Sequence, residues 1–304
     1  MKKRIVLAGG TGFVGQSLAP FLQSHGYEIV VLTRGPSRDG VIRHLHWDGR
    51  NVADWKSEID GAFAIVNLAG RSINCRHTAR HRREIIDSRV DSIRAFIDAI
   101  SQCVQPPQVF VQAAGVGIYG DSGDRICSEN APHGSDFVAK VCVDWEAAAE
   151  SVHAQGMRKV TLRLGVVLGR DGGFLVVLAK LTRLFLGGHV GSGKQFISWI
   201  HITDLCRIFL AAIEREEIAG TFNATAPNPV TNAEFMRELR RALHRPWSPP
   251  VPGFAARIGA WLMGTEGKLA LVSQRCIPKR LTDSGFAFQF PNLSEALAQI
   301  YPTP

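Results

Sequence analysis

Near its start the chain reads Arg4-Ile5-Val6-Leu7-Ala8-Gly9-Gly10-Thr11-Gly12-Phe13-Val14-Gly15, an apolar run that ends in a glycine cluster. Gly10, Gly12 and Gly15 satisfy the pattern G-x-G-x-x-G, and residues 16–23 continue with the apolar spacing of a helix. This order predicts a buried strand, a tight turn and a helix start. Such a turn lets a pyrophosphate approach the backbone, and the helix start offers it free N–H groups. We therefore predict a dinucleotide site; the alternative is a glycine-rich turn that binds nothing.

The composition is that of an ordinary globular protein. The chain has 304 residues, of which 45% are hydrophobic, enough for one large α/β domain and a smaller one. The six cysteines contain no C-x-x-C pair, which is typical of reduced thiols and favours a cytoplasmic location. The most apolar segment, residues 174–186, is too short to span a bilayer and is interrupted by Lys180 and Arg183, so we expect no membrane partner.

The net charge of +8 raises the question of a nucleic-acid partner. Arginines are dense in residues 71–94 and 237–245, but the first stretch also has the pattern of an amphipathic helix. Because no aromatic residues alternate with the arginines for base stacking, we expect solvated helix faces and no nucleic acid. His77 and His81 have metal-ligand spacing, yet the arginines beside them would repel a cation. We expect no metal.

Short β-type runs alternate with helical stretches along most of the chain. Parallel strands need crossover helices, so this rhythm predicts a doubly wound parallel sheet, a Rossmann fold. The pattern favours a dinucleotide-binding domain at 1–228 and a small, mostly helical lobe at 229–304, to which residues 173–200 contribute. The expected strands are 5–8, 28–32, 42–47, 63–69, 108–114, 159–168 and 222–224, and the expected helices are 18–25, 77–103, 137–154, 173–186, 201–214 and 232–243.

The end of the second predicted strand indicates which dinucleotide is bound. In this fold an acidic residue about 20 positions past the glycine turn binds the ribose 2′-hydroxyl of NAD and repels a 2′-phosphate. Here the strand ends in Thr33-Arg34, and no carboxylate follows until Asp39. A guanidinium suits a phosphate, and the threonine adds a hydroxyl donor. We predict NADP(H); the alternative is that Arg34 is an ordinary surface residue of a loop.

Several further segments carry a family resemblance. The glycine turn is followed in order by Val66-Asn67-Leu68-Ala69-Gly70, Tyr119-Gly120-Asp121 and Trp199-Ile200-His201-Ile202-Thr203-Asp204-Leu205. This order resembles the extended short-chain dehydrogenase/reductase superfamily. Gln274-Arg275-Cys276-Ile277-Pro278-Lys279-Arg280-Leu281 looks like the atypical "epimerase family protein" branch, NAD(P)-dependent epimerase/dehydratase-like proteins with a small C-terminal domain of unknown function.

The resemblance implies an NADP(H) site, a small-molecule substrate and, as is common in this superfamily, a homodimer through the helices at 77–103 and 137–154. The implied cofactor-binding residues are Gly9, Thr11, Gly12, Phe13, Val14, Thr33, Arg34, Leu68, Ala69, Gly70, Glu84, Arg89 and Val166.

The catalytic residues of the superfamily are absent. Its reductases and epimerases use a tyrosine, a lysine four residues later and an upstream serine, because the ammonium lowers the pKa of the phenol. None of the three tyrosines here has a lysine at that spacing. Phe137 stands near the tyrosine position, and the serine position falls in Gln112-Ala113-Ala114-Gly115.

Two readings follow from this departure. In the first, the protein is an oxidoreductase or epimerase-like enzyme that acts on an unknown small carbonyl or hydroxyl substrate by hydride transfer. Tyr119, Lys140, His201 or Glu129 would then serve as acid or base, and Tyr119 is preferred because it follows the fifth strand at the ligand-binding edge. In the second, the protein is a catalytically silent NADP(H)-binding sensor or interaction module. The expected pocket residues are Ile118, Tyr119, Phe174, Lys194, Phe196, Trp199 and Trp261.

Overall fold

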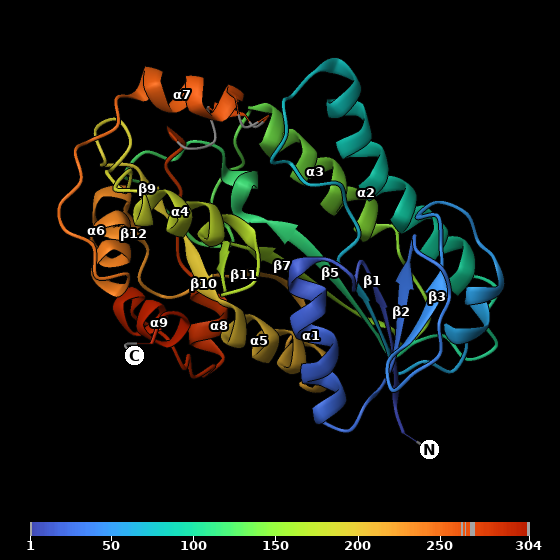
Figure 1. Cartoon of the computed structure of the whole chain (residues 1–304). Helices are drawn as coiled ribbons and strands as arrows, with labels where there is room; N and C mark the ends of the chain where they lie inside the picture. The colour runs from blue at the N-terminus through green and yellow to red at the C-terminus, as the bar shows by residue number, and fades with distance from the viewer. Residues whose placement is uncertain (1, 263, 265, 268–270, 303–304) are drawn as a thin grey trace.

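A seven-stranded parallel sheet forms the centre of the computed structural model, which describes residues 2–262, 264, 266–267 and 271–302 (Figure 1). Its order is β11-β7-β5-β4-β1-β2-β3, so the chain builds outward from β1 in both directions. Ligands of such sheets bind beyond the carboxyl ends of the strands, where the order reverses, here between β1 and β4. The strands are β1 (Arg4–Ala8), β2 (Glu28–Thr33), β3 (Arg43–His46), β4 (Ala64–Asn67), β5 (Val109–Gly115), β7 (Arg158–Leu164) and β11 (Gly220–Ala224).

Helices cover both faces of this sheet. Helices α1 (Phe13–Ser24) and α5 (Ile202–Glu214) pack together on one face, and α2 (Ala79–Ile100) and α3 (Phe137–Glu150) pack together on the other (Figure 1). Coverage on both faces explains why the central strands are continuous apolar runs without a polar alternation. The predicted doubly wound fold is confirmed. No helix in the described part of the chain is long and apolar enough to cross a membrane.

The prediction of one strand over residues 159–168 is wrong. Strand β7 ends at Leu164, and β8 (Val166–Leu168) pairs instead with β10 (Trp199–His201) in a separate two-stranded sheet. Gly165 lies at the break, where a Cβ atom would stand 2.8 Å from the carbonyl oxygen of Ser198. The chain leaves the main sheet at the one residue that tolerates this close backbone approach.

The C-terminal region is mostly helical, as predicted, and has its own apolar core. Helices α4 (Gly173–Arg183), α6 (Asn232–Ala242) and α9 (Leu293–Ile300) enclose this core. Its members before residue 229 include Leu168, Leu175 and Trp199. The remaining elements are η1 (Asp54–Glu58), η2 (Val116–Tyr119), β6 (Ile126–Cys127), β9 (Phe196–Ile197), β12 (Val230–Thr231), α7 (Gly253–Leu262), β13 (Arg275–Cys276) and α8 (Lys279–Asp283).

Backbone pairing and one buried carboxylate join this region to the sheet domain. Strand β13 pairs in parallel with β6, which precedes α3. The carboxylate of Asp204, fully buried on α5, accepts 2.8 Å hydrogen bonds from the backbone N–H groups of Gln289 and Phe290. The two predicted domains therefore share a two-stranded sheet and hydrogen bonds. The domain boundary at residue 228 stays a prediction.

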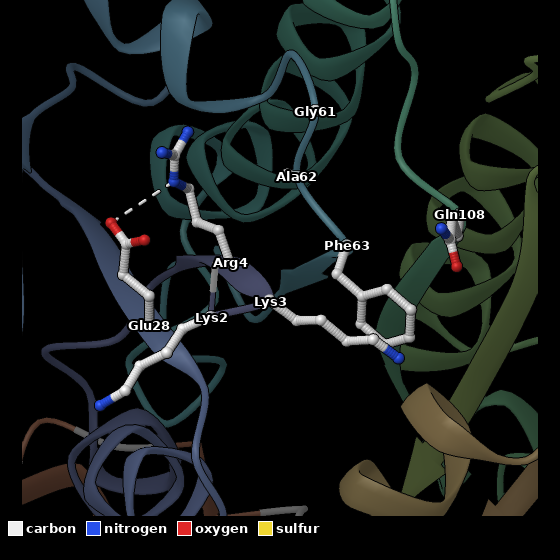
Figure 2. Close-up of a pocket in the computed structure, with 8 residues that line it drawn as sticks. All are labelled: Lys2, Lys3, Arg4, Glu28, Gly61, Ala62, Phe63 and Gln108. Atoms are coloured by element: carbon white, nitrogen blue, oxygen red, sulfur yellow. Dashed lines mark ion pairs between the residues drawn. The ribbon is translucent and has the colours of Figure 1, made fainter.

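An open cavity of about 630 Å³ lies at the amino ends of the central strands (Figure 2). Figure 2 shows the Lys3 side chain extending along Phe63, and its ammonium stands 4.0 Å from the ring centroid. Arg4 pairs with Glu28 across the same cavity at 3.5 Å. The glycine turn follows the carboxyl end of β1, so this cavity lies at the opposite end of the strands. Dinucleotides bind at the carboxyl ends, so the cavity is not part of the predicted dinucleotide site.

The expected homodimer would use the exposed surfaces of α2 and α3. Among the described side chains, none of the exposed large apolar residues lies on either helix. Stable homodimer interfaces are more apolar than the rest of the surface. A dimer through α2 and α3 stays a prediction, and these faces carry none of the large exposed apolar side chains that such an interface would use.

Candidate functional site

The glycine turn between β1 and α1 is shaped by two close backbone approaches. Gly9 has a φ of +73°, and a Cβ atom there would stand 2.8 Å from the carbonyl carbon and oxygen of Leu68. A Cβ atom at Gly15 would stand 2.4 Å from the Cα atom of Gly10. Only glycine fits at both positions, so the ends of β1 and β4 and the first turn of α1 are drawn together.

The start of α1 is open to an anion. Its N-cap residue is Gly12, no side chain caps the helix, and the first turn holds no acidic residue. Thr11 and Gly12 are exposed, and Phe13 and Val14 are half-buried. The first N–H groups of the helix and its positive dipole end are therefore available to a phosphate.

The segment that follows β8 packs against this helix start. A Cβ atom at Gly172 would stand 2.4 Å from the ring of Phe13, and one at Gly169 would stand 2.8 Å from it. Small residues therefore let this segment lie directly on the phenyl ring. The contact brings the chain just beyond Val166, which begins β8, against the glycine turn.

Arg34 is exposed just beyond the end of β2 and has no hydrogen-bond or ion-pair partner among the described residues. Its neighbour Arg38 instead bonds the Nε2 atom of His44 at 3.1 Å. The Thr33 hydroxyl oxygen accepts a hydrogen bond from the backbone N–H of Gly35 at 3.1 Å, which leaves its proton free to be donated. A free guanidinium beside a free hydroxyl donor suits a phosphate group.

Arg89 lies beneath the end of β4. It is 8% exposed, its guanidinium stands 4.6 Å from the Trp145 ring centroid, and burial lowers its pKa. A Cβ atom at Gly70 would stand 3.1 Å from the guanidinium carbon. Its Nη1 atom donates to two backbone carbonyl oxygens at 2.9 Å, while its Nε atom has no partner.

Glu84, by contrast, is already held by arginines. Its carboxylate pairs with Arg80 at 2.8 Å and also with Arg71, and the hydrogen bond from Arg80 lowers its pKa. The structure therefore brings Arg89 to the end of β4 and leaves Glu84 in an ion-pair cluster at the start of α2.

The residues that face Gly117 on α3 carry no acid–base group active near neutrality. A Cβ atom at Gly117 would stand 2.7 Å from Val138 and 3.7 Å from the Sγ atom of Cys142, four residues further along the helix. Burial raises the pKa of the Cys142 thiol to about 12. Lys140 lies between them in sequence but is exposed and pairs with Asp144 at 3.3 Å.

Tyr119 is enclosed rather than facing an open site. It is 1% exposed, and its hydroxyl donates to Asn223 Oδ1 at 2.7 Å and accepts from Arg163 Nη1 at 2.8 Å. Burial raises its pKa to about 12 although Arg163 opposes the shift. Tyr119 and Lys140 have separate partners, so the structure does not bring these two catalytic candidates together as an acid–base pair.

Comparison with known proteins assigns the chain to a family. Residues 5–224 match the NAD dependent epimerase/dehydratase family, and residues 251–300 match a domain of unknown function, DUF1731. The chain belongs to the NAD dependent epimerase/dehydratase family. The first match covers all of the parallel sheet except its first residue, and the second begins just before α7 and ends with α9.

Relatives of this epimerase/dehydratase family member are similar over nearly their whole length. The Bos taurus epimerase family protein SDR39U1 is 36% identical over 302 residues, which cover 98% of this chain and 99% of that protein. Bacillus subtilis YfhF is 33% identical and covers 97% of each chain. A crystal structure of human SDR39U1 with NADPH superposes with a TM-score of 0.88 at 33% identity, covering 99% of this chain and all of that one.

Two other catalytic candidates in this family member are also held by structural contacts. His201 is buried: its Nδ1 atom accepts from the backbone N–H of Thr203, and its Nε2 atom therefore donates to Gln299 Oε1 at 3.0 Å. Burial lowers the pKa of His201. Glu129 is buried, and its Oε1 atom accepts backbone N–H bonds from Asn223 and Arg280.

The expected pocket residues separate into two groups. Ile118, Tyr119 and Trp199 are fully buried in apolar cores, and Phe196 is half-buried under the guanidinium of Arg275. The exposed ones are Phe174, Lys194 and Trp261.

Sequence reasoning missed the buried charged group beside Tyr119. Arg163 on β7 makes two 2.8 Å bonds to the carboxylate of Glu146 on α3 and also donates to the Glu129 carbonyl oxygen at 2.9 Å. The one sequence signal for this buried ion pair was an arginine within an apolar strand, because a buried charge needs a partner.

We expect Tyr119→Phe to lower the free energy of unfolding by about 1–2 kcal/mol, because Asn223 and Arg163 each lose one buried partner. Coenzyme affinity and any turnover should stay unchanged, since the hydroxyl is enclosed. Urea unfolding and a nucleotide titration of the same variant measure both. Loss of turnover with full stability and full coenzyme affinity would instead make Tyr119 a catalytic residue.

Proposed function

We propose that this epimerase/dehydratase family member binds NADP(H) and transfers a hydride between it and a small carbonyl or hydroxyl substrate. The observation that carries the proposal is the Arg34 guanidinium, which has no partner among the described residues. It lies just beyond the end of β2, the strand that pairs with β1, and β1 leads into the open start of α1. Human SDR39U1, crystallised with NADPH, supports it. The proposed cofactor-binding residues are Gly9, Thr11, Gly12, Phe13, Val14, Thr33, Arg34, Leu68, Ala69, Gly70, Glu84, Arg89 and Val166.

The residues present fit the coenzyme's charged groups. The turn at Gly9 leads into a start of α1 that no described side chain caps and that holds no acidic residue in its first turn, which suits a pyrophosphate. Arg34 and Thr33 offer donors to a ribose 2′-phosphate, and no described carboxylate forms an ion pair with Arg34. When bound, the coenzyme supplies or accepts the hydride.

The proton that accompanies hydride transfer is assigned to solvent. Tyr119 is enclosed, and the α3 residues that face Gly117 are Val138 and Cys142. A thiol with a pKa of about 12 does not exchange protons efficiently near neutrality. The same absence favours a second candidate function, an NADP(H)-binding sensor without turnover.

Titration of the protein with NADPH and NADH, followed by nicotinamide fluorescence, tests this proposal. We expect NADPH to bind at least about tenfold more tightly, because one charge-assisted hydrogen bond contributes roughly 1.5–3 kcal/mol. Bound NADPH is then offered to a panel of carbonyl compounds. Consumption supports the oxidoreductase, and tight binding without consumption supports the sensor. If neither nucleotide binds, the site is not a coenzyme site.

A further inference from the structure

Two buried cysteines from distant parts of the sequence lie side by side in a small sheet. Strands β6 and β13 pair in parallel, and the register places Cys276 directly beside Cys127. Both residues are 0% exposed, and both belong to one small apolar cluster that also holds Tyr119 and Cys142. Side chains at paired positions of neighbouring strands point to the same face of the sheet. The two thiols, both free, are therefore neighbours.

The two thiols also interact with each other. A hydrogen bond with Cys276 lowers the pKa of the Cys127 thiol, although burial opposes this shift. The same hydrogen bond, together with burial, raises the pKa of Cys276. Cys276 therefore keeps its proton, and Cys127 has the greater thiolate character. The thiolate is the form of cysteine that reacts with an oxidant.

The strand pairing holds the two residues at a separation that suits a disulfide. Neighbouring strands lie about 4.8 Å apart, and disulfides join residues whose Cα atoms are roughly 4.4–6.8 Å apart. On the β13 side, the backbone N–H of Cys276 donates to the Ser198 hydroxyl oxygen at 2.7 Å, and that hydroxyl donates to the carbonyl oxygen of Gln274 at 2.7 Å. A bond between the sulfur atoms therefore needs no change of strand register.

The third cysteine of the cluster has a different environment. Cys142 lies on α3, and its Sγ atom would stand 3.7 Å from a Cβ atom at Gly115 or at Gly117. Burial raises its pKa to about 12. Such a thiol is a poor nucleophile near neutrality. Cys142 therefore provides a comparison within the same cluster.

Short pairing gives small oxidants a route to the buried sulfur atoms. Strands β6 and β13 contain two residues each. Ile126, which directly precedes Cys127, is 52% exposed, and residues 123–125 before it are exposed as well. Segments with so few backbone hydrogen bonds open locally at a small cost in free energy. Local opening of β6 would bring Cys127 to water.

We propose that Cys127 and Cys276 are a reactive dithiol that a peroxide oxidises to a reversible disulfide. The Cys127 thiolate attacks one peroxide oxygen, the O–O bond breaks, and a sulfenic acid forms while hydroxide leaves and takes a proton from solvent. The Cys276 sulfur then attacks the sulfenic sulfur. The S–S bond forms as the S–O bond breaks, and the departing hydroxyl leaves as water with the Cys276 proton. Two thiols are oxidised, and one peroxide is reduced to two waters.

The disulfide joins the C-terminal region to the sheet domain. Cys127 lies between η2 and α3, and Cys276 lies between α7 and α8, so the bond links residues 127 and 276 across a long loop of chain. Closing a long loop restricts the unfolded chain, which favours the folded state. The inference is independent of the proposed coenzyme function, because neither cysteine is among the proposed cofactor-binding residues.

Oxidation of the folded, fully reduced protein by hydrogen peroxide near neutral pH tests the proposal. After the peroxide is removed with catalase, free thiols are counted in denaturant, and the digested protein is analysed by mass spectrometry without reduction. We expect a loss of two of the six thiols and one linked peptide pair that contains Cys127 and Cys276. Dithiothreitol should restore all six thiols.

Two variants identify the participating sulfur atoms. Cys276→Ala removes the second thiol and should yield no disulfide at Cys127, whereas Cys142→Ala should form the bond as the unchanged protein does. The peptide masses of the unchanged protein decide the question even where a variant does not fold. Retention of all six thiols, or a bond that joins a different pair, would overturn the proposal. NADPH titration is a separate measurement, so failure of the coenzyme function would leave this result unaffected.

Discussion

Arg34→Ala is expected to weaken NADPH binding by about 10- to 100-fold while changing NADH binding little. The guanidinium has no partner among the described residues, so its removal costs the fold nothing that the structure shows. What is lost is a charge-assisted contact with the 2′-phosphate, which contributes roughly 1.5–3 kcal/mol. NADH lacks that phosphate. The preference for NADPH should therefore largely disappear.

Arg38→Ala provides the matched control for this measurement. Arg38 lies in the same exposed loop but already bonds His44, so it is less free to reach a phosphate. Both variants are titrated with both nucleotides at one fixed salt concentration, because salt screens the charge contribution. An unchanged NADPH affinity in Arg34→Ala, or an equal loss in Arg38→Ala, would show that Arg34 is an ordinary loop residue.

Arg163→Met is expected to lower the free energy of unfolding by about 3–5 kcal/mol. The Arg163 and Glu146 side chains are 6% and 14% exposed, so the substitution leaves a carboxylate with little water and no cation. Tyr119 and the Glu129 carbonyl oxygen lose a donor at the same time. Breaking a buried pair from one side costs more than the pair itself contributes, because the remaining charge stays desolvated.

Two further variants show whether that loss comes from the buried charge. The double variant Arg163→Met with Glu146→Leu should recover a large part of the stability, since no uncompensated charge remains. Arg241→Met removes an exposed partner of Glu238 and should change stability by less than about 1 kcal/mol. Urea unfolding compares all three. A loss below about 1 kcal/mol in Arg163→Met would contradict the structural role given to this pair.

The buried polar contacts around Tyr119 lie away from the part of α3 that faces Gly117. The Tyr119 hydroxyl joins β7 and β11 through Arg163 and Asn223, whereas Val138 and Cys142 are the residues of α3 that lie against Gly117. The polar network that stabilises the sheet therefore does not depend on the side chains of α3 at Gly117.

Local patterns were enough to predict the sheet and the glycine turn. The apolar run before Gly9 and the glycine spacing depend on steric limits within a few residues, and the structure places them as expected. The prediction of one strand over 159–168 was wrong because the break at Gly165 does not depend on neighbouring residues alone. Both halves have strand composition, and only the distant Ser198, which approaches Gly165, decides that they belong to different sheets.

The sequence by itself determined the parallel fold, the glycine turn and a second strand that ends without a carboxylate, because each depends on neighbouring residues and on backbone sterics. Only the tertiary structure decided which candidates are accessible. Tyr119 meets a partner 104 positions away, and Arg163 meets one 17 positions away. Burial and hydrogen bonding between such distant residues set pKa values and exposure, and no local pattern records them.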